Sequence, residues 1–219
     1  MPFLLFTLHL IYNISGDYMN IQENTFFESC DFSHEDLTDY NLNGKTFISC
    51  NFKDCDMTEL EISNARFESC NFTLADLKSI SCTNCAFTNS NFENVNLFLS
   101  TFKDCKMTGS NFAGTTTTGM NILSGDWSYV NLRGANFKNH KLENINFERA
   151  DLSETSFEGA KLDNVNFSYS ILNKCLFINA DLRGSNLANT PIKSMILKNT
   201  KVNFETALMI SEAYGGVCI

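Results

Sequence analysis

The sequence predicts an all-β solenoid, in which the chain turns a corner every five residues. Large apolar residues recur at every fifth position from residue 27 to residue 202, at 34 of 36 positions. The other four positions of the unit each have their own residue types, and no insertion shifts the phase. A period of five fits neither the 3.6 of a helix nor the 2.0 of a strand. Four units would instead close one square coil, and the coils would stack.

The apolar position is the centre of each unit, and it holds 15 of the 20 Phe residues. Only Cys82 and Thr117 depart from a large apolar centre. Coils that stack like strands, about 4.8 Å apart, would bury these centres as one column. The 36 units predict about nine coils and a rod about 43 Å long. At Thr117 we expect a bulge or a thinner core.

The two positions before each centre have distinct chemistry. The residue two before the centre points inward and is small, and seven of the nine Cys occupy this position. The residue just before the centre is Asp or Asn in 19 units, where a short polar side chain can bond its own backbone and stabilise the corner. Lys45 and His140 occupy inward positions, which predicts local splaying of the coil.

The repeat divides the chain into three parts. Residues 1–20 form an N-terminal extension, which is either an upstream part of the reading frame or a flexible tail. Residues 21–202 form the solenoid. Residues 203–219 leave the lattice: Asn203 is an N-cap candidate, residues 204–214 have the pattern of a helix, and Gly215 ends it.

Composition excludes several classes of protein. The net charge is −9, from 16 Lys plus Arg and 25 Asp plus Glu, which argues against direct binding of nucleic acid. Abundant Phe and only two Pro argue against a disordered chain. No apolar run of about 18 residues is present, so no membrane span is expected.

The acidic residues are concentrated near the N-terminus. Residues 1–80 contain 13 acidic and four basic side chains, and the remainder contains 12 of each. Residues 20 apart share a face of a square coil, which predicts an acidic stripe that could dock on a basic DNA-binding surface. The alternative is that these charges keep an edge-ended β structure soluble. The candidate partner-binding residues of this acidic face are Asp36, Asp39, Asp56, Glu59 and Asp76.

No motif indicates an enzyme, a metal site or a cofactor. Cys82 and Cys85 form a CxxC, but the packing positions explain both, and no second CxxC or paired His accompanies them. The sequence has no phosphate-binding loop, nucleophile elbow or dinucleotide fingerprint. An interior filled by Phe and Leu also leaves no concave substrate pocket.

The repeat unit resembles that of the pentapeptide-repeat family: a small residue, Asp or Asn, Leu or Phe, a polar residue and a variable one. Matching segments are Ala150-Asp151-Leu152-Ser153-Glu154, Ala180-Asp181-Leu182-Arg183-Gly184, Cys70-Asn71-Phe72-Thr73 and Ala135-Asn136-Phe137-Lys138. The resemblance covers about 80% of the chain. It implies a right-handed quadrilateral β-helix.

Three further segments resemble the Qnr quinolone-resistance proteins. These are Ala207-Leu208-Met209 with the tail Gly215-Gly216-Val217-Cys218-Ile219, the start from Met19 to Phe27, and the stretch from Ser110 to Leu132. The resemblance implies a cytoplasmic homodimer that binds a type II DNA topoisomerase (DNA gyrase or topoisomerase IV) and protects it from fluoroquinolones. It also implies that the C-terminal helix caps the last coil and forms the dimer. The candidate dimer-interface residues are Phe204, Ala207, Leu208, Ile210 and Tyr214.

The sequence departs from many Qnr proteins in one respect. Those of Gram-negative bacteria often carry loops that interrupt the coils, whereas the unbroken phase here allows none. Contacts with a partner would then come from the faces of the rod. Two hypotheses therefore stay open: a topoisomerase-binding protein that partly mimics DNA, and a pentapeptide-repeat scaffold or binding module with another protein partner.

Overall fold

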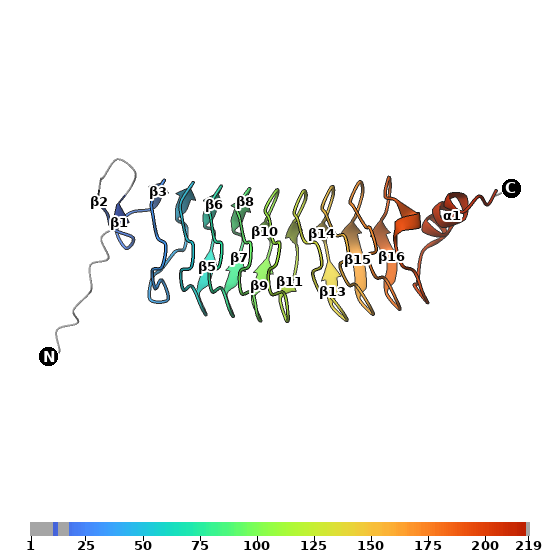
Figure 1. Cartoon of the computed structure of the whole chain (residues 1–219), viewed down its shortest axis with the longest axis horizontal. Coiled ribbons are helices and arrows are strands. Elements are labelled where there is room, and N and C mark those ends of the chain that lie inside the picture. Colours follow the sequence, from blue (N-terminus) through green and yellow to red (C-terminus); the bar gives the residue numbers. More distant parts are fainter. Residues whose placement is uncertain (1–10, 13–17, 218–219) are drawn as a thin grey trace.

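The chain forms a straight rod of stacked β-coils with one helix at its C-terminal end (Figure 1). The computed structural model describes residues 11–12 and 18–217. Most of the predicted N-terminal extension, residues 1–20, lies outside the described residues. Within it, β1 (Ile11–Tyr12) pairs with β2 (Tyr18–Met19) in antiparallel fashion.

Most strands of the rod are only two or three residues long, because each of these occupies a single side of the coil. The strands are β3 (Phe26–Glu28), β4 (Thr46–Ile48), β5 (Glu61–Ser63), β6 (Arg66–Glu68), β7 (Ser81–Thr83), β8 (Ala86–Thr88), β9 (Thr101–Lys103), β10 (Cys105–Lys106), β11 (Asn121–Ile122), β12 (Gly125–Asp126), β13 (Lys141–Glu143), β14 (Ile145–Asn146), β15 (Lys161–Asn166) and β16 (Asp181–Asn186). A 3-10 helix, η1 (Ile192–Ser194), and an α-helix, α1 (Phe204–Ala213), follow.

The pairing register confirms the predicted coil of 20 residues. Phe26 pairs with Thr46 at the start of the rod and Asp181 bridges to Lys201 at its end, both in parallel. This span contains eight full turns and most of a ninth. One irregularity occurs, where Asp163 pairs with Gly184, 21 residues on. No insertion interrupts the described turns, in agreement with the unbroken phase of the sequence.

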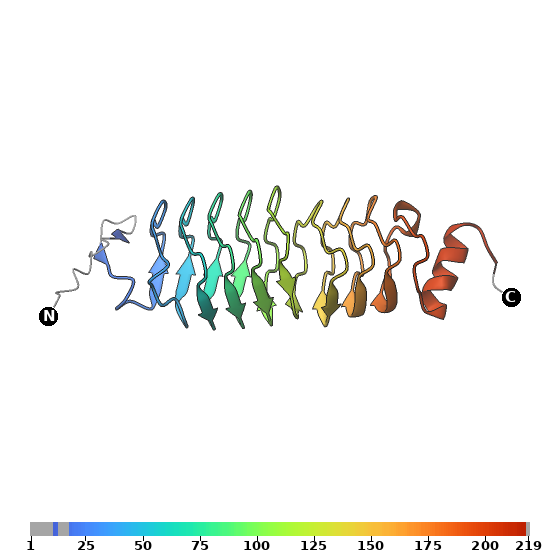
Figure 2. The same cartoon turned by 90° about the horizontal axis from the view of Figure 1, so that it is seen from below.

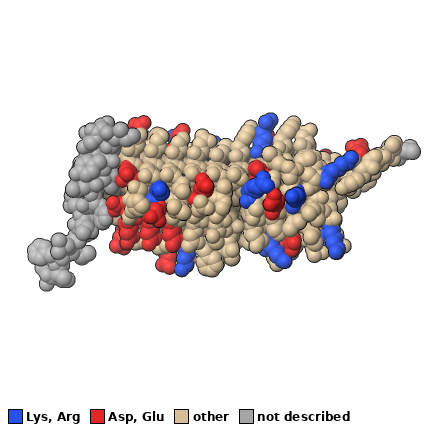
Figure 3. All heavy atoms as spheres, viewed as in Figure 1, with Lys and Arg blue, Asp and Glu red and all other residues tan. Residues whose placement is uncertain are grey.

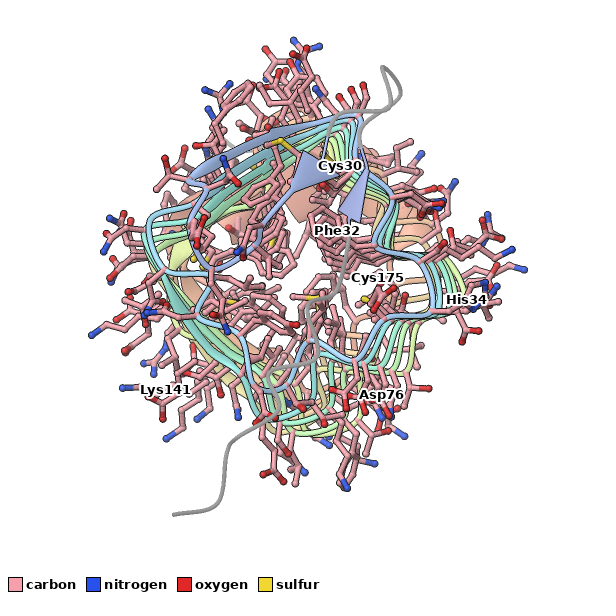
Figure 4. The ribbon with its side chains drawn as sticks, turned by 90° about the vertical axis from the view of Figure 1, so that its left-hand side faces the viewer. Cys30, Phe32, His34, Asp76, Lys141 and Cys175 are labelled. Atoms are coloured by element: carbon pink, nitrogen blue, oxygen red, sulfur yellow. The ribbon has the colours of Figure 1, made fainter. Side chains whose placement is uncertain are left out.

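The coil has four sides, which Figure 4 shows in end view. One side carries the sheet that runs from β3 through β4, β6, β8, β10 and β12 to β14. Another carries β5, β7, β9 and β11. The remaining two sides are held by single parallel bridges, such as Asp31 to Asn51 and Asp36 to Asp56. The predicted fold class is confirmed: the chain is a four-sided β-solenoid with a short C-terminal helix.

The central column of apolar side chains is the core. Phe27, Phe47 and Phe67 stack face to face at centroid distances of 4.9 and 4.8 Å, close to the spacing of the strands. Phe32 and Phe52 stack in the same way on the next side, at 4.7 Å. Rings on adjacent sides meet edge to face, which is a favourable arrangement for aromatic pairs.

Most corners have a residue in the left-handed backbone region, two positions after the centre. Asn and Gly adopt this conformation more readily than other residues, and they fill many of the corners, including Asn84, Asn94 and Gly114. Asp and Asn before the centre support the turn in most of the units that carry them, as predicted. The Oδ1 of Asp31, for example, accepts from the N–H of Ser33 at 3.0 Å.

The structure adds two hydrogen-bond series that the sequence did not predict. Asn side chains bond along the rod: Asn71 Nδ2 donates to Asn51 Oδ1 at 3.1 Å. Small inward side chains donate to the carbonyl of a centre in the previous turn, as Ser185 does to Leu162 at 3.1 Å. Inward Cys, Ser and Thr thus combine small volume with a donor, which explains their frequency at this position.

The two polar inward residues differ in their effects. Lys45 is only 6% exposed, its Nζ donates to the carbonyl of Asn24 at 2.7 Å, and the register continues past it. The expected splaying is therefore wrong at Lys45. At His140 the hydrogen bonding between successive turns is interrupted: among the described strands, β11 does not pair with β13. Figure 2 shows a wider step there, near the middle of the rod.

Candidate partner-binding face and dimerisation helix

Three Asp residues form a column on one side of the N-terminal half of the rod. Asp36 bridges to Asp56 and Asp56 to Asp76 in parallel register, so the three carboxylates lie on successive turns. Each Oδ1 accepts from the backbone N–H two residues later, at 2.9–3.0 Å. These bonds fix the side chains at the corner. Figure 4 shows Asp76 pointing outward from the coil.

This acidic column replaces the amide ladder found elsewhere on the rod. An Asp side chain at neutral pH carries no N–H, so Asp56 cannot donate to Asp36 as Asn51 donates to Asp31. The amide ladder begins only at Asn96, whose Nδ2 donates to Asp76 Oδ1 at 3.0 Å. Like charges on adjacent strands destabilise a sheet, so the column lowers the stability of the fold.

The two other predicted acidic residues lie near the column. Asp39 and Glu59 are exposed and follow the centres of its first two turns. Asp54, at the preceding corner, binds His34 at 3.0 Å. Figure 3 shows the acidic side chains gathered at the N-terminal end of the rod, with mixed charges toward the C-terminal end. The structure therefore brings all five predicted residues to one side of the rod.

Helix α1 begins as the sequence predicted. The side chain of Asn203 accepts from the N–H of Thr206 at 2.8 Å, which caps the first turn. The helix ends at Ala213, and Gly215 follows with a φ of +87°. Met209 and Ile210 pack against the core of the rod. This contact covers the last coil.

The predicted dimer-interface residues differ in exposure. Phe204 is 86% exposed and Tyr214 67% exposed, and Ala207 is also exposed. Leu208 and Ile210 are half-buried, and Ile210 contacts the chain's own core. Exposed apolar side chains gathered at the end of a rod are typical of an interaction site.

An open groove of about 640 Å³ lies between η1 and α1. Pro191, Ile192 and Met209 contribute apolar lining, and Lys193 and Glu212 contribute charge. Lys193 Nζ lies 5.9 Å from the ring centroid of Tyr214, within the range of a cation–π contact. The groove extends the apolar surface of α1 onto the last coil.

A second groove, of about 450 Å³, lies across β13, β15 and β16. Its charged side chains neutralise one another: Lys141 binds Glu143 at 2.8 Å and Arg183 binds Asp181 at 2.7 Å. The hydrogen bond from Arg183 lowers the pKa of Asp181 to about 2. With three acidic and three basic side chains, the lining of the groove carries no net charge.

All the described cysteines are buried free thiols. Burial raises the pKa of Cys30 to about 11 and that of Cys55 to about 12, so both remain protonated at neutral pH. Protonated thiols are poor nucleophiles and poor metal ligands. Among residues 11–12 and 18–217, no three His, Cys, Asp or Glu side chains gather in a way that could hold a metal ion.

The geometry defines a class of protein, a β-solenoid built from five-residue units. Comparison with protein families identifies the chain as a member of the pentapeptide-repeat family. Residues 36–73 and 75–114 match the description "Pentapeptide repeats (8 copies)", and residues 130–206 match "Pentapeptide repeat region". A comparison with curated protein sequences found no significant match.

Among solved structures, the chain is similar to QnrB1, described as a plasmid-mediated fluoroquinolone resistance protein. One trypsin-treated variant of QnrB1 is 22% identical, with a TM-score of 0.70 over 88% of this chain and 95% of that one. A second trypsin-treated variant is 21% identical, with a TM-score of 0.72 over 90% and 100%. Full-length QnrB1 is 21% identical, with a TM-score of 0.66 over 87% and 98%. At this identity the similarity establishes a shared fold.

The described part of the chain contains no helix with the length and apolar character needed to cross a bilayer.

Proposed function

We propose that the chain binds a type II DNA topoisomerase, DNA gyrase or topoisomerase IV, and protects it from fluoroquinolones. The acidic column of Asp36, Asp56 and Asp76 is the observation that carries this proposal. It places fixed negative charge on an exposed side of a rod whose fold matches QnrB1 over most of its length. Its cost to the stability of the fold favours a role outside the fold.

The column would act as a partial mimic of DNA. A topoisomerase must present basic surface to duplex DNA, which carries about one charge per 1.7 Å. A rod with a net charge of −9 supplies only part of the charge on an equal length of duplex, about 25. The column would therefore steer and orient the complex, and apolar and polar contacts along the faces would supply the remaining affinity.

Helix α1 is the proposed dimerisation element. Its exposed residues Phe204, Ala207 and Tyr214 and the groove beside η1 would be covered by the same elements of a second copy. A two-fold dimer of this kind would join two rods end to end, with an acidic column near each outer end. Because the proposed partner is a cytoplasmic enzyme, the proposed activity is cytoplasmic as well.

The proposal is tested by gyrase supercoiling assays with ciprofloxacin, in the presence and absence of the protein. We expect the protein to restore supercoiling at drug concentrations that inhibit gyrase alone. The triple variant Asp36→Asn, Asp56→Asn, Asp76→Asn should weaken this rescue and the binding of gyrase. It should still fold, because Asn occupies the same position in other turns, including Asn96.

The matched control removes three charges from other sides of the same half of the rod, with Glu28→Gln, Glu61→Gln and Glu93→Gln, all exposed. If both triple variants lose binding equally, net charge and not the acidic column is responsible. If the protein neither rescues gyrase nor inhibits it at any concentration, the topoisomerase proposal is wrong.

A pentapeptide-repeat scaffold with a different protein partner is the second candidate. The absence of insertions between Phe26 and Lys201 favours it, because any binding must use the faces of the rod instead of projecting loops. Absence of both gyrase and topoisomerase IV binding, with the dimer intact, would support this candidate.

A further inference from the structure

A stack of Tyr129, Arg149 and Tyr169, here called the Tyr–Arg–Tyr ladder, runs along one corner of the C-terminal half of the rod. The three residues lie 20 apart, on successive turns. The guanidinium carbon of Arg149 lies 5.8 Å from the ring centroid of Tyr129 and 5.0 Å from that of Tyr169. Both distances are within the range of cation–π contacts.

The Tyr–Arg–Tyr ladder is exposed, and apolar side chains flank Arg149. Tyr129 is 55% and Tyr169 51% exposed, although each carries a large aromatic ring. Ile171, two residues beyond Tyr169, is also exposed. Tyr and Arg are, with Trp, enriched among the few central residues that supply most of the binding energy of protein–protein interfaces.

The backbone at the ladder has the conformation found at most corners of the rod. Tyr129, Arg149 and Tyr169 all have a φ of 58°, in the left-handed region that bulky residues seldom adopt. The same corner carries Asn89 before the ladder and Asn189 after it, residues suited to this conformation. Leu74, Leu99 and Lys174 adopt the same conformation at other corners, so it belongs to the coil and fixes the direction of these three side chains without marking a site.

The stacked rings leave Arg149 with a defined set of open donors. Their faces lie along its guanidinium, and its Nε makes one long ion pair with Glu148, at 3.5 Å. Its two terminal nitrogens bond to no other described residue. A guanidinium held in place loses less conformational freedom on binding, and its planar fork fits a carboxylate through two parallel hydrogen bonds.

We propose that the Tyr–Arg–Tyr ladder is a second docking surface, which binds a protein segment carrying a carboxylate beside apolar side chains. The carboxylate would bind the terminal nitrogens of Arg149, and the apolar neighbours would pack on Tyr129, Tyr169 and Ile171. This surface lies on the half of the rod opposite the acidic column, and the proposal is independent of the topoisomerase.

Charge and surroundings favour a carboxylate over a phosphate. Glu148 lies next to Arg149 and repels a doubly charged phosphate more strongly than a single carboxylate. A single carboxylate brings less charge than a phosphate, and a peptide can present it beside apolar side chains. The exposed rings provide the matching apolar surface.

The test is an NMR titration of the full chain with the acetylated, amidated peptide Leu-Glu-Leu-Glu-Leu. We expect saturable shifts of the Arg149 Nε–H signal and of the backbone amides of Tyr129 and Tyr169. The same peptide with Gln in place of Glu should bind about tenfold more weakly, because it lacks the carboxylates. Inorganic phosphate at equal concentration should not displace the Glu peptide.

Two variants locate the site. Tyr129→Asn with Tyr169→Asn introduces the residue found at this corner in other turns, so folding should be preserved. Arg149→Lys keeps the charge but loses the fork. Each should weaken peptide binding about tenfold, whereas Leu99→Asn, at an exposed left-handed corner on another side of the rod, should leave it unchanged. Equal binding of the Gln peptide, displacement by phosphate, unchanged binding by both variants, or self-association through the ladder without peptide would each overturn the proposal.

Discussion

Nε2 of His140 lies 3.0 Å from the carbonyl oxygen of Met120, where neighbouring turns place a backbone N–H. One turn earlier, Asn121 N donates to Ser100 O at 2.8 Å, and one turn later, Lys161 N donates to His140 O at 2.9 Å. The imidazole thus substitutes for a backbone donor where β11 and β13 separate. The buried carbonyl keeps a partner, and the cost of leaving it unsatisfied is avoided.

The separation of β11 from β13 predicts a local difference in amide hydrogen exchange. The amides of Thr117 and Gly119 have no backbone acceptor in the following turn among the described residues, whereas Leu97 and Leu99 donate to Thr116 and Thr118. We expect the first pair to exchange at least about tenfold faster than the second, because their exchange needs no opening of a ladder bond. Exchange measured by NMR provides the comparison, and equal protection of the two pairs would contradict the prediction.

The stacked Phe column predicts a large loss of stability when one ring is removed. Phe47 is fully buried and stacks between Phe27 and Phe67. Phe47→Ala should lower the free energy of unfolding by about 3–5 kcal/mol, through lost burial and a cavity that the stacked turns cannot close. Chemical denaturation measures this loss. Phe26→Ala, at a half-exposed ring one residue before a centre, is the control and should cost much less.

The period of five was sufficient to predict the solenoid, because every position of the unit is constrained by one side of a square coil. The centres, the inward small residues and the corner Asp and Asn all occupy their predicted places. The alignment of Asp36, Asp56 and Asp76 on one side of the rod could also be predicted, because they are spaced 20 residues apart. Which exposed face binds a partner could not be predicted, because outward residues are free of packing constraints.

Departures from the repeat were harder to predict. Lys45 and His140 occupy the same inward position of their five-residue units. The pairing between turns is interrupted only at His140. Lys45 has a long, flexible stem that reaches the carbonyl of Asn24, whereas the ring of His140 reaches Met120 in the turn below. Thr117, which occupies a centre, is buried. Two units later the centre is Trp127, a much larger side chain that is also fully buried. How the rod accommodates a polar inward residue or a small centre depends on contacts between turns, which the sequence of a single unit does not determine.

Asp126 predicts part of the acid sensitivity of the rod. Burial raises its pKa, but hydrogen bonds from Ser128, Thr108 and Asn146 outweigh this effect, and the net result is a lowered pKa. The unfolded chain therefore binds a proton more readily. The stability contributed by Asp126 is complete above its ordinary pKa of 3.8 and is lost as the pH falls through the lower folded pKa.

The variant Asp126→Asn removes this contribution while keeping the shape of the side chain. Its melting temperature should fall less than that of the wild type between about pH 5 and about pH 3, as measured by circular dichroism. Asp39→Asn, at an exposed acidic residue, is the control for loss of one charge. An identical pH dependence for Asp126→Asn and the wild type would show that Asp126 does not contribute.

The exposed end of α1 allows the proposed dimer to be tested without loss of the fold. Phe204 is 86% exposed and begins the helix, one residue after the cap Asn203. Phe204→Asp removes apolar surface from the proposed interface, and a carboxylate at a helix N-terminus stabilises the helix. We expect sedimentation velocity to show a weaker dimer and circular dichroism to show unchanged structure. Deletion of residues 203–219 should give a monomer or an aggregate, because it also uncovers the last coil.

The control is Glu205→Gln, which changes an exposed neighbour of Phe204 in the first turn of α1 without removing apolar surface. It should leave the dimer intact. If Phe204→Asp and the wild type sediment identically as dimers, the interface lies elsewhere on the rod. If both are monomers at every concentration, the apolar end of α1 serves only to cover the last coil, and any protection of a topoisomerase would be an activity of single rods.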